Sequence, residues 1–91
     1  MNEMGLVTVS SAYSAAQTLD RLQTAIQAAG MTVFAVFDHT KAASQAGLEL
    51  RPTTVVAFGN PAAGTMLMQV NQTMGIDLPL KILVWEDDPE W

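Results

Sequence analysis

The 91-residue chain is 49% hydrophobic and 14% charged, with four Lys/Arg against nine Asp/Glu and a formal net charge of −5. This length predicts a single domain spanning residues 1–91, and the absence of cysteine excludes a disulfide framework and a thiolate metal site. The few scattered cations argue against nucleic-acid binding. The absence of a long apolar run and of a basic N-terminal region predicts a cytoplasmic protein with no membrane span and no signal peptide.

The first predicted elements are a strand and a helix. Leu6–Ser10 alternates apolar and polar residues, which is typical of a strand with one buried face. Ser14 and, three residues on, Gln17 form a capping box, which predicts the start of a helix. Gly30 predicts the end of that helix in a left-handed conformation.

Two more strands follow, with a short helix between them. Met31–Phe37 is apolar on both faces, which predicts a central strand. Thr40–Ala46 predicts a turn of helix that Gly47 stops. Thr53–Phe58 is rich in β-branched residues and predicts the third strand.

The C-terminal part predicts a second full helix and a fourth strand. The helix begins at Pro61 or Thr65 and runs to about Met74, where Gly75 caps it. Leu80–Trp85 is the fourth strand. The order β-α-β-(α)-β-α-β predicts an α/β fold, a two-layer sandwich with the helices on one face of a mixed sheet.

Polar and turn-forming residues stand at the ends of these apolar runs, where a fold can display them in a shared cleft. The candidate ligand-binding residues are Asp38, His39, Arg51, Asn60, Gly64, Thr65 and Asp77. His39 is the only histidine and could act as a general acid/base or bind a metal, oriented by Asp38. Alternatively, Asp38 caps the short helix and His39 bonds a backbone carbonyl. One histidine without cysteine cannot supply the three or four ligands of a transition-metal site within a monomer, so no metal site is expected. No cofactor is expected either.

The loop Gly59–Thr65 resembles a phosphate-binding loop that lacks its lysine. It predicts either a small anion held by free amides at a helix N-terminus or a tight turn with Asn60 as the N-cap. Arg51 could clamp the same anion or could pair with Asp77 or Asp38.

Four sequence blocks carry a family resemblance. The blocks LRPTTVVAFGNPAAGT and GIDLPLKILVWED, the N-terminal VTVSS-x-Y-S and the helix end QAAGMTVFAVFDH resemble the bacterial and archaeal domain-of-unknown-function family numbered 302. The resemblance covers nearly the whole chain and implies a small two-layer α/β fold, found as homodimers, with no established reaction. Family members continue past the acidic WED with a glycine turn, a further strand and a short helix, so the resemblance implies that this chain lacks them.

The low charge fraction also predicts a homodimer, because so few charges cannot cover a small monomer. Its interface is expected to include Leu80–Trp85 or the methionines Met66, Met68 and Met74. Two functions from different classes remain. The first is a non-catalytic dimeric module that binds a small anionic ligand or a partner in the polar cleft. The alternative is a small enzyme that uses His39 as a general acid/base with Asp38 or Asp77.

Overall fold

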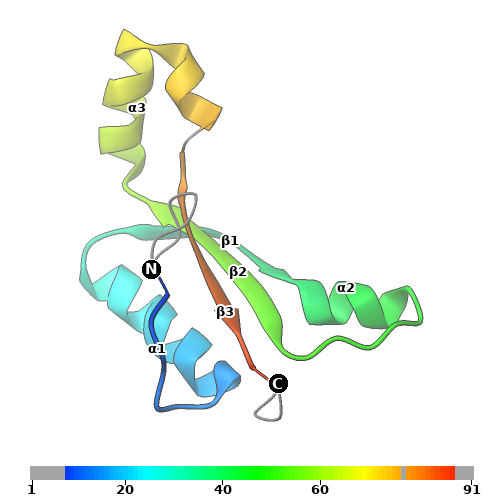
Figure 1. The fold of residues 1–91 in the computed structure, drawn as a ribbon. Coiled ribbons are helices and arrows are strands. Elements are labelled where there is room, and N and C mark those ends of the chain that lie inside the picture. The colour runs from blue at the N-terminus through cyan, green and yellow to red at the C-terminus, as the bar shows by residue number, and fades with distance from the viewer. Residues whose placement is uncertain (1–7, 77, 88–91) are drawn as a thin grey trace.

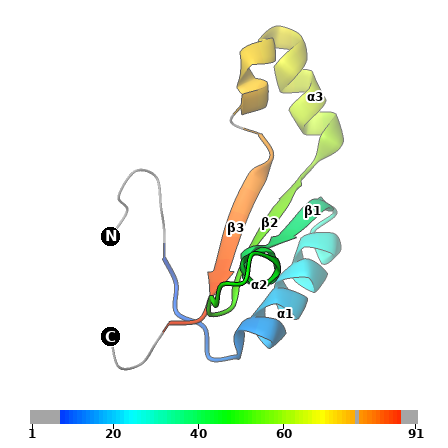
Figure 2. The ribbon, with the colours of Figure 1, turned by 90° about the vertical axis from the view of Figure 1, so that its right-hand side faces the viewer.

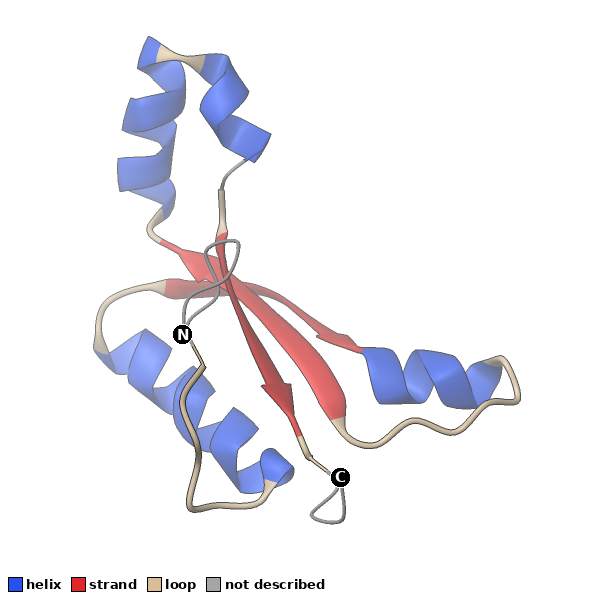
Figure 3. Ribbon diagram, viewed as in Figure 1, coloured by secondary structure: helices blue, strands red, loops and turns tan. Residues whose placement is uncertain are grey.

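A three-stranded sheet with helices at one face and at both ends organises the chain. The computed structural model describes residues 8–76 and 78–87. Their elements in chain order are α1 (Ala15–Ala28), β1 (Thr32–Asp38), α2 (His39–Gln45), β2 (Thr53–Gly59), α3 (Pro61–Val70), the 3-10 helix η1 (Gln72–Ile76) and β3 (Leu80–Trp85). This mixture of helices and strands confirms the predicted α/β class (Figure 3).

The described strands are all antiparallel, in the order β1-β2-β3. The middle of the sheet is the row in which Val36, Val56 and Ile82 lie opposite one another. The sheet was expected to be mixed, and its described part is purely antiparallel. Of the predicted first strand, residues 6 and 7 lie outside the described residues, and Thr8–Ser10 are not in a strand.

β2, not β1, is the central strand of the described sheet. The prediction that Met31–Phe37 is central was therefore wrong. β1 is apolar on both faces because one face packs against a helix, while the other presents apolar side chains that the described chain leaves exposed. The alternation of buried and half-buried residues along β2 fits a strand with a neighbour on each side.

Helix α1 covers one face of the sheet (Figure 2). Its capping box is present: the Ser14 side chain accepts a hydrogen bond from the Gln17 backbone, and the Gln17 side chain accepts one from the Ser14 backbone. The helix ends as predicted before Gly30, which has a φ of 79°. Ile26 of α1 packs on Val56 and Phe58 of β2, and this cluster is the core of the domain.

The other helices extend from the ends of the sheet (Figure 1). α2 begins where β1 stops and ends before Gly47, whose φ is 76°. α3 ends at Val70, four residues earlier than predicted, because Asn71 adopts an extended conformation. The Asn71 side chain accepts hydrogen bonds from the backbone N–H and the hydroxyl of Thr73, and such local bonds compete with helix continuation. Gly75 therefore lies in η1 and does not cap α3.

α3 and η1 form a hairpin that packs chiefly on itself. A Cβ at Gly75 would lie 3.3 Å from the Met68 sulfur, so the two helices approach closely there. Met66 and Val70 of the same hairpin are exposed. The hairpin thus stands apart from the core made by α1 and the sheet.

Candidate functional site

The antiparallel topology divides the predicted binding residues between the two ends of the sheet. Asp38 lies opposite Thr54, near the start of β2, and His39 follows it directly. Asn60 follows the other end of β2. Seven strand residues span roughly 20 Å, so the single polar cleft predicted from the sequence does not form from these residues.

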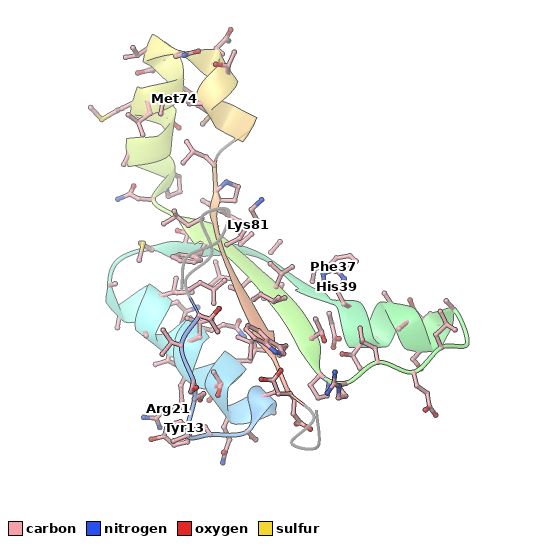
Figure 4. The ribbon with its side chains drawn as sticks, viewed as in Figure 1. Tyr13, Arg21, Phe37, His39, Met74 and Lys81 are labelled. Carbon is pink, nitrogen blue, oxygen red and sulfur yellow. The ribbon has the colours of Figure 1, made fainter. Side chains whose placement is uncertain are left out.

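Asp38 and His39 are arranged as structural residues. The Asp38 carboxylate accepts a hydrogen bond of 2.9 Å from the Lys41 backbone N–H, which makes it the N-cap of α2. The His39 ring meets the Phe37 ring edge-on, with centroids 4.8 Å apart. Figure 4 shows both rings on the side of the sheet away from α1. His39 is exposed and lines neither of the grooves described below, so the geometry lends no support to proton transfer by this pair.

Arg51 lies at the same end of the sheet and is half-buried. Its carbonyl accepts hydrogen bonds from the hydroxyls of Thr40 and Thr53. Asp77, its predicted partner, lies outside the described residues. Arg51 precedes β2 and Asp77 precedes β3 in the sequence, so the predicted pair requires the two strands to start at the same end of the sheet. The antiparallel pairing of β2 with β3 contradicts this requirement.

The second group of predicted residues surrounds the start of α3. The Asn60 side chain accepts hydrogen bonds from the backbone N–H groups of Ala62 and Ala63, so Asn60 is the N-cap, as one of the two interpretations predicted. The N–H of Gly64 donates to the Asn60 carbonyl. These three amides already donate within the chain, which removes much of the basis for an anion site. Thr65 is exposed.

Neither a metal site nor a membrane span is found in the part of the chain that the structure describes. No group of three or more His, Cys, Asp or Glu side chains is gathered there. None of the helices in residues 8–76 and 78–87 combines the length and apolar character needed to cross a bilayer.

Two grooves are present, and none of the candidate residues lines them. A shallow one of about 640 Å³ follows the outer surface of α1, where the Arg21 guanidinium lies 4.2 Å from the centroid of the Tyr13 ring (Figure 4). The other, of about 600 Å³, separates residues 8–14 and α1 from β3. Its hydroxyl-rich lining includes Ser11 and Thr18, whose oxygens are 2.7 Å apart. This groove was not predicted from the sequence, although the serine-rich segment before α1 was a signal.

The most distinctive surface is the sheet face opposite α1. Thr54, Val56 and Phe58 are buried toward α1, and alternate strand residues point to opposite sides. Val55 and Ala57 therefore belong to the other side. We call this side the open face; it consists of Thr32, Phe34, Ala35 and Phe37 of β1, Thr53, Val55, Ala57 and Gly59 of β2, and Lys81, Leu83 and Trp85 of β3. Phe34 is placed there by a register shift in β1, and its ring lies 3.4 Å from the position of a Cβ on Gly59.

Large apolar side chains are exposed on the open face. The exposed fractions are 48% for Phe34, 53% for Phe37, 45% for Leu83 and 42% for Trp85. Among the described elements, α1 packs on the other side, and α2 and α3 extend beyond the strand ends (Figures 1 and 2). The sequence contained the signal, since Met31–Phe37 is apolar on both faces, but the pattern was interpreted as a central strand.

Comparison with known proteins gives a family and a fold. Residues 7–90 match the family described as "Domain of unknown function DUF302". A crystal structure of an uncharacterized conserved protein of this family from Bacillus stearothermophilus is similar with a TM-score of 0.79 and 23% identity. The similarity covers 88% of this chain and 63% of that one, and it supports the fold.

The curated relatives are longer proteins. The chain is 44% identical to proteins named "Fluoride-specific ion channel FluC 1" from Brucella suis and Brucella abortus. The match covers 98% of this chain but only 39% and 37% of those proteins. The chain thus spans less than two-fifths of the length of each, and their name describes the whole proteins.

Proposed function

The chain belongs to the family described as domain of unknown function DUF302, and since that description names no activity, we propose that the domain is a non-catalytic association module whose protein partner is a second copy of the same chain. One observation carries the proposal: Phe34, Phe37, Leu83 and Trp85 are exposed together on one face of the sheet. Contiguous apolar surface of this kind marks an interaction site in a folded protein.

The small core supports the same conclusion. Among the described residues, the buried hydrophobic side chains are Ile26, Val56, Phe58 and Val84. Most other large apolar side chains remain partly or largely exposed, which is costly in water at about 25 cal/mol per Å² of apolar surface. A protein partner that covers them removes this cost. The 14% charged composition points the same way, because it leaves few charges to keep such a surface in water.

The geometry favours a protein partner over the small anion considered from the sequence. The polar candidates are divided between the strand ends, and Asn60 already accepts hydrogen bonds from amides at the start of α3. The curated relatives add support, since a segment 44% identical to this chain forms 39% of a longer protein. A domain that occurs within larger proteins suits a role in association. The proposal keeps the cytoplasmic location expected from the lack of a basic N-terminal region and of a long apolar run in the sequence.

Sedimentation velocity over a range of concentrations tests this function. We expect a reversible dimer whose fraction rises between low and high micromolar concentration. A chain that sediments as a folded monomer at 500 µM contradicts the dimeric module.

A further inference from the structure

We infer that the dimer forms by packing the open face of one copy on the open face of a second copy, with the two-fold axis running across the strands. This inference rests on the proposed function and specifies the surface and the symmetry. It follows from the sizes of the side chains on the face and from the area that the face offers, and the position of its charge is compatible with it.

Two adjacent rows on the open face differ in size. The strand register places Phe37, Val55 and Leu83 in one row. The next row on the same face consists of Ala35, Ala57 and Lys81. The two rows are about 7 Å apart, which is two residues along a strand. The side chains of the first row are large and apolar. Those of the second row are small, apart from the flexible lysine at its edge.

These rows make the face complementary to itself. A two-fold axis that crosses the strands between the rows places Phe37 of each copy on Ala35 of the other, and Val55 on Ala57. Large side chains then fill the space above small ones, as close packing requires. An axis along the strands would instead set the large row on the large row and leave a gap over the alanines.

The charge of the open face is compatible with the same axis. Lys81 is the charged side chain of the open face as the described register defines it. With the axis across the strands, β3 lies antiparallel on β3 of the second copy. Lys81 then lies over Leu83 of the second copy, and because β3 is an edge strand of the described sheet, the flexible lysine stem carries its ammonium group out to water. With the axis along the strands, Lys81 would instead lie over Ala35 of the second copy, within the interface.

The area fits a weak dimer. Exposed fractions between 42% and 53% on Phe34, Phe37, Leu83 and Trp85 leave roughly 350 Å² of apolar surface on each copy. With the adjoining strand surface, two copies bury about 1,000 Å², the lower limit for a specific interface. A dissociation constant in the micromolar range is therefore expected.

A matched pair of charge insertions tests the surface. Leu83→Glu adds a charge to the open face, and Val70→Glu adds the same charge to α3, where Val70 is 88% exposed. We expect Leu83→Glu to raise the dimer dissociation constant at least tenfold and Val70→Glu to change it less than twofold. Circular dichroism and thermal unfolding verify that both variants fold. A Leu83→Glu variant that fails to fold is replaced by Ala57→Glu on the same face.

The outcomes separate this inference from the proposed function. If Val70→Glu weakens the dimer as much as the variant on the open face, or more, the assignment of the interface is overturned although the module is still dimeric. If the open-face variant dimerises with the same dissociation constant as the unchanged protein, the assignment of the interface is likewise overturned. A wild-type monomer at 500 µM overturns the proposed function itself.

Spin-label distances test the axis. Because the chain has no cysteine, single cysteines introduced as Ile82→Cys and Glu86→Cys on β3 carry one label per copy, and Ile82 points away from the open face. With the axis across the strands, Ile82 lies near the axis and Glu86 about 14 Å from it along the strand. We expect the distance between the two Glu86 labels to exceed that between the Ile82 labels by more than ~10 Å. Equal distances overturn the axis.

Discussion

The hydroxyl of Thr40 accepts a hydrogen bond of 2.8 Å from the backbone N–H of Thr53, thirteen residues later in the chain. The same hydroxyl donates to the carbonyl of Arg51 at 2.9 Å. One side chain thereby joins the first turn of α2 to the start of β2. It holds the long connection between the two strands against the end of the sheet.

Replacing Thr40 with valine is expected to lower the free energy of unfolding by about 1–2 kcal/mol, because the part-buried N–H of Thr53 loses its acceptor. Urea unfolding measures the change. Thr40→Ser keeps the hydroxyl and serves as the control, with an expected loss of less than about half the valine value. Equal losses for the two variants would attribute the effect to packing of the methyl group.

Two glycine positions should respond to alanine in opposite directions. A Cβ at Gly64 would lie 3.7 Å from the Leu78 side chain, an ordinary contact, within α3. Gly64→Ala is expected to stabilise the protein by about 0.5–1 kcal/mol through helix propensity. Gly30 also has room for a methyl group, but its φ is 79°, so Gly30→Ala should destabilise by about 1 kcal/mol. Thermal unfolding of both variants checks the two signs.

Ser14→Ala should destabilise the domain by about 1 kcal/mol, because it removes the hydroxyl that accepts the hydrogen bond from the backbone N–H of Gln17 at the start of α1. α1 covers the core face, so the loss should appear in the global unfolding midpoint. Ser14→Asp preserves an acceptor and should retain most of the stability. If the alanine and aspartate variants unfold at the same denaturant concentration, the cap contributes nothing measurable.

Ile26 is 3% exposed and connects α1 to the central strand. Ile26→Ala is expected to cost about 2–5 kcal/mol and Ile26→Val about 0.5–1.5 kcal/mol. Total stability for a chain of this length is on the order of 5–13 kcal/mol, so the alanine variant removes a large part of it. Denaturant unfolding monitored by circular dichroism gives both values. An alanine variant within about 1 kcal/mol of the unchanged protein would place the core elsewhere.

The Trp85 indole N–H donates to the Asp87 carboxylate at 2.6 Å. Asp87→Ala should move the indole proton resonance of Trp85 upfield and speed its exchange with water, since the charged acceptor is lost. A Trp91→Phe background leaves Trp85 as the single indole signal in the NMR spectrum. An unchanged resonance would indicate that water replaces the carboxylate without consequence.

The local parts of the fold could be predicted from the sequence because adjacent residues determine them. The Ser14 capping box, the glycine at position 30 and the Asp38 cap are encoded within a few residues, and each is present. The bounds of β3 at Leu80 and Trp85 also agree with the prediction. The end of α3 was missed because the Asn71 side chain competes with the helix through bonds that periodicity does not reveal.

The arrangement of the site could not be predicted, because it depends on pairing between distant segments. Parallel and antiparallel strands have the same composition, yet the antiparallel choice separates His39 from Asn60 by the length of β2. The open face was missed for a related reason. A strand that is apolar on both sides is either a central strand or a strand with only one side covered by a helix. β1 is of the second kind, because its Phe37 is exposed on the uncovered side.

The central position of β2 also determines when the strands can pair during synthesis. In the described sheet β1 and β3 both bond to β2 and not to each other. Among the described strands, β1 is synthesised before its partner β2, so Thr32–Asp38 waits for that partner until Gly59 has been made. At about 5–20 residues per second this interval lasts roughly 1–4 s. A nascent chain thus carries this apolar strand without its described partner for seconds, and exposed strands of this kind are prone to aggregate during folding.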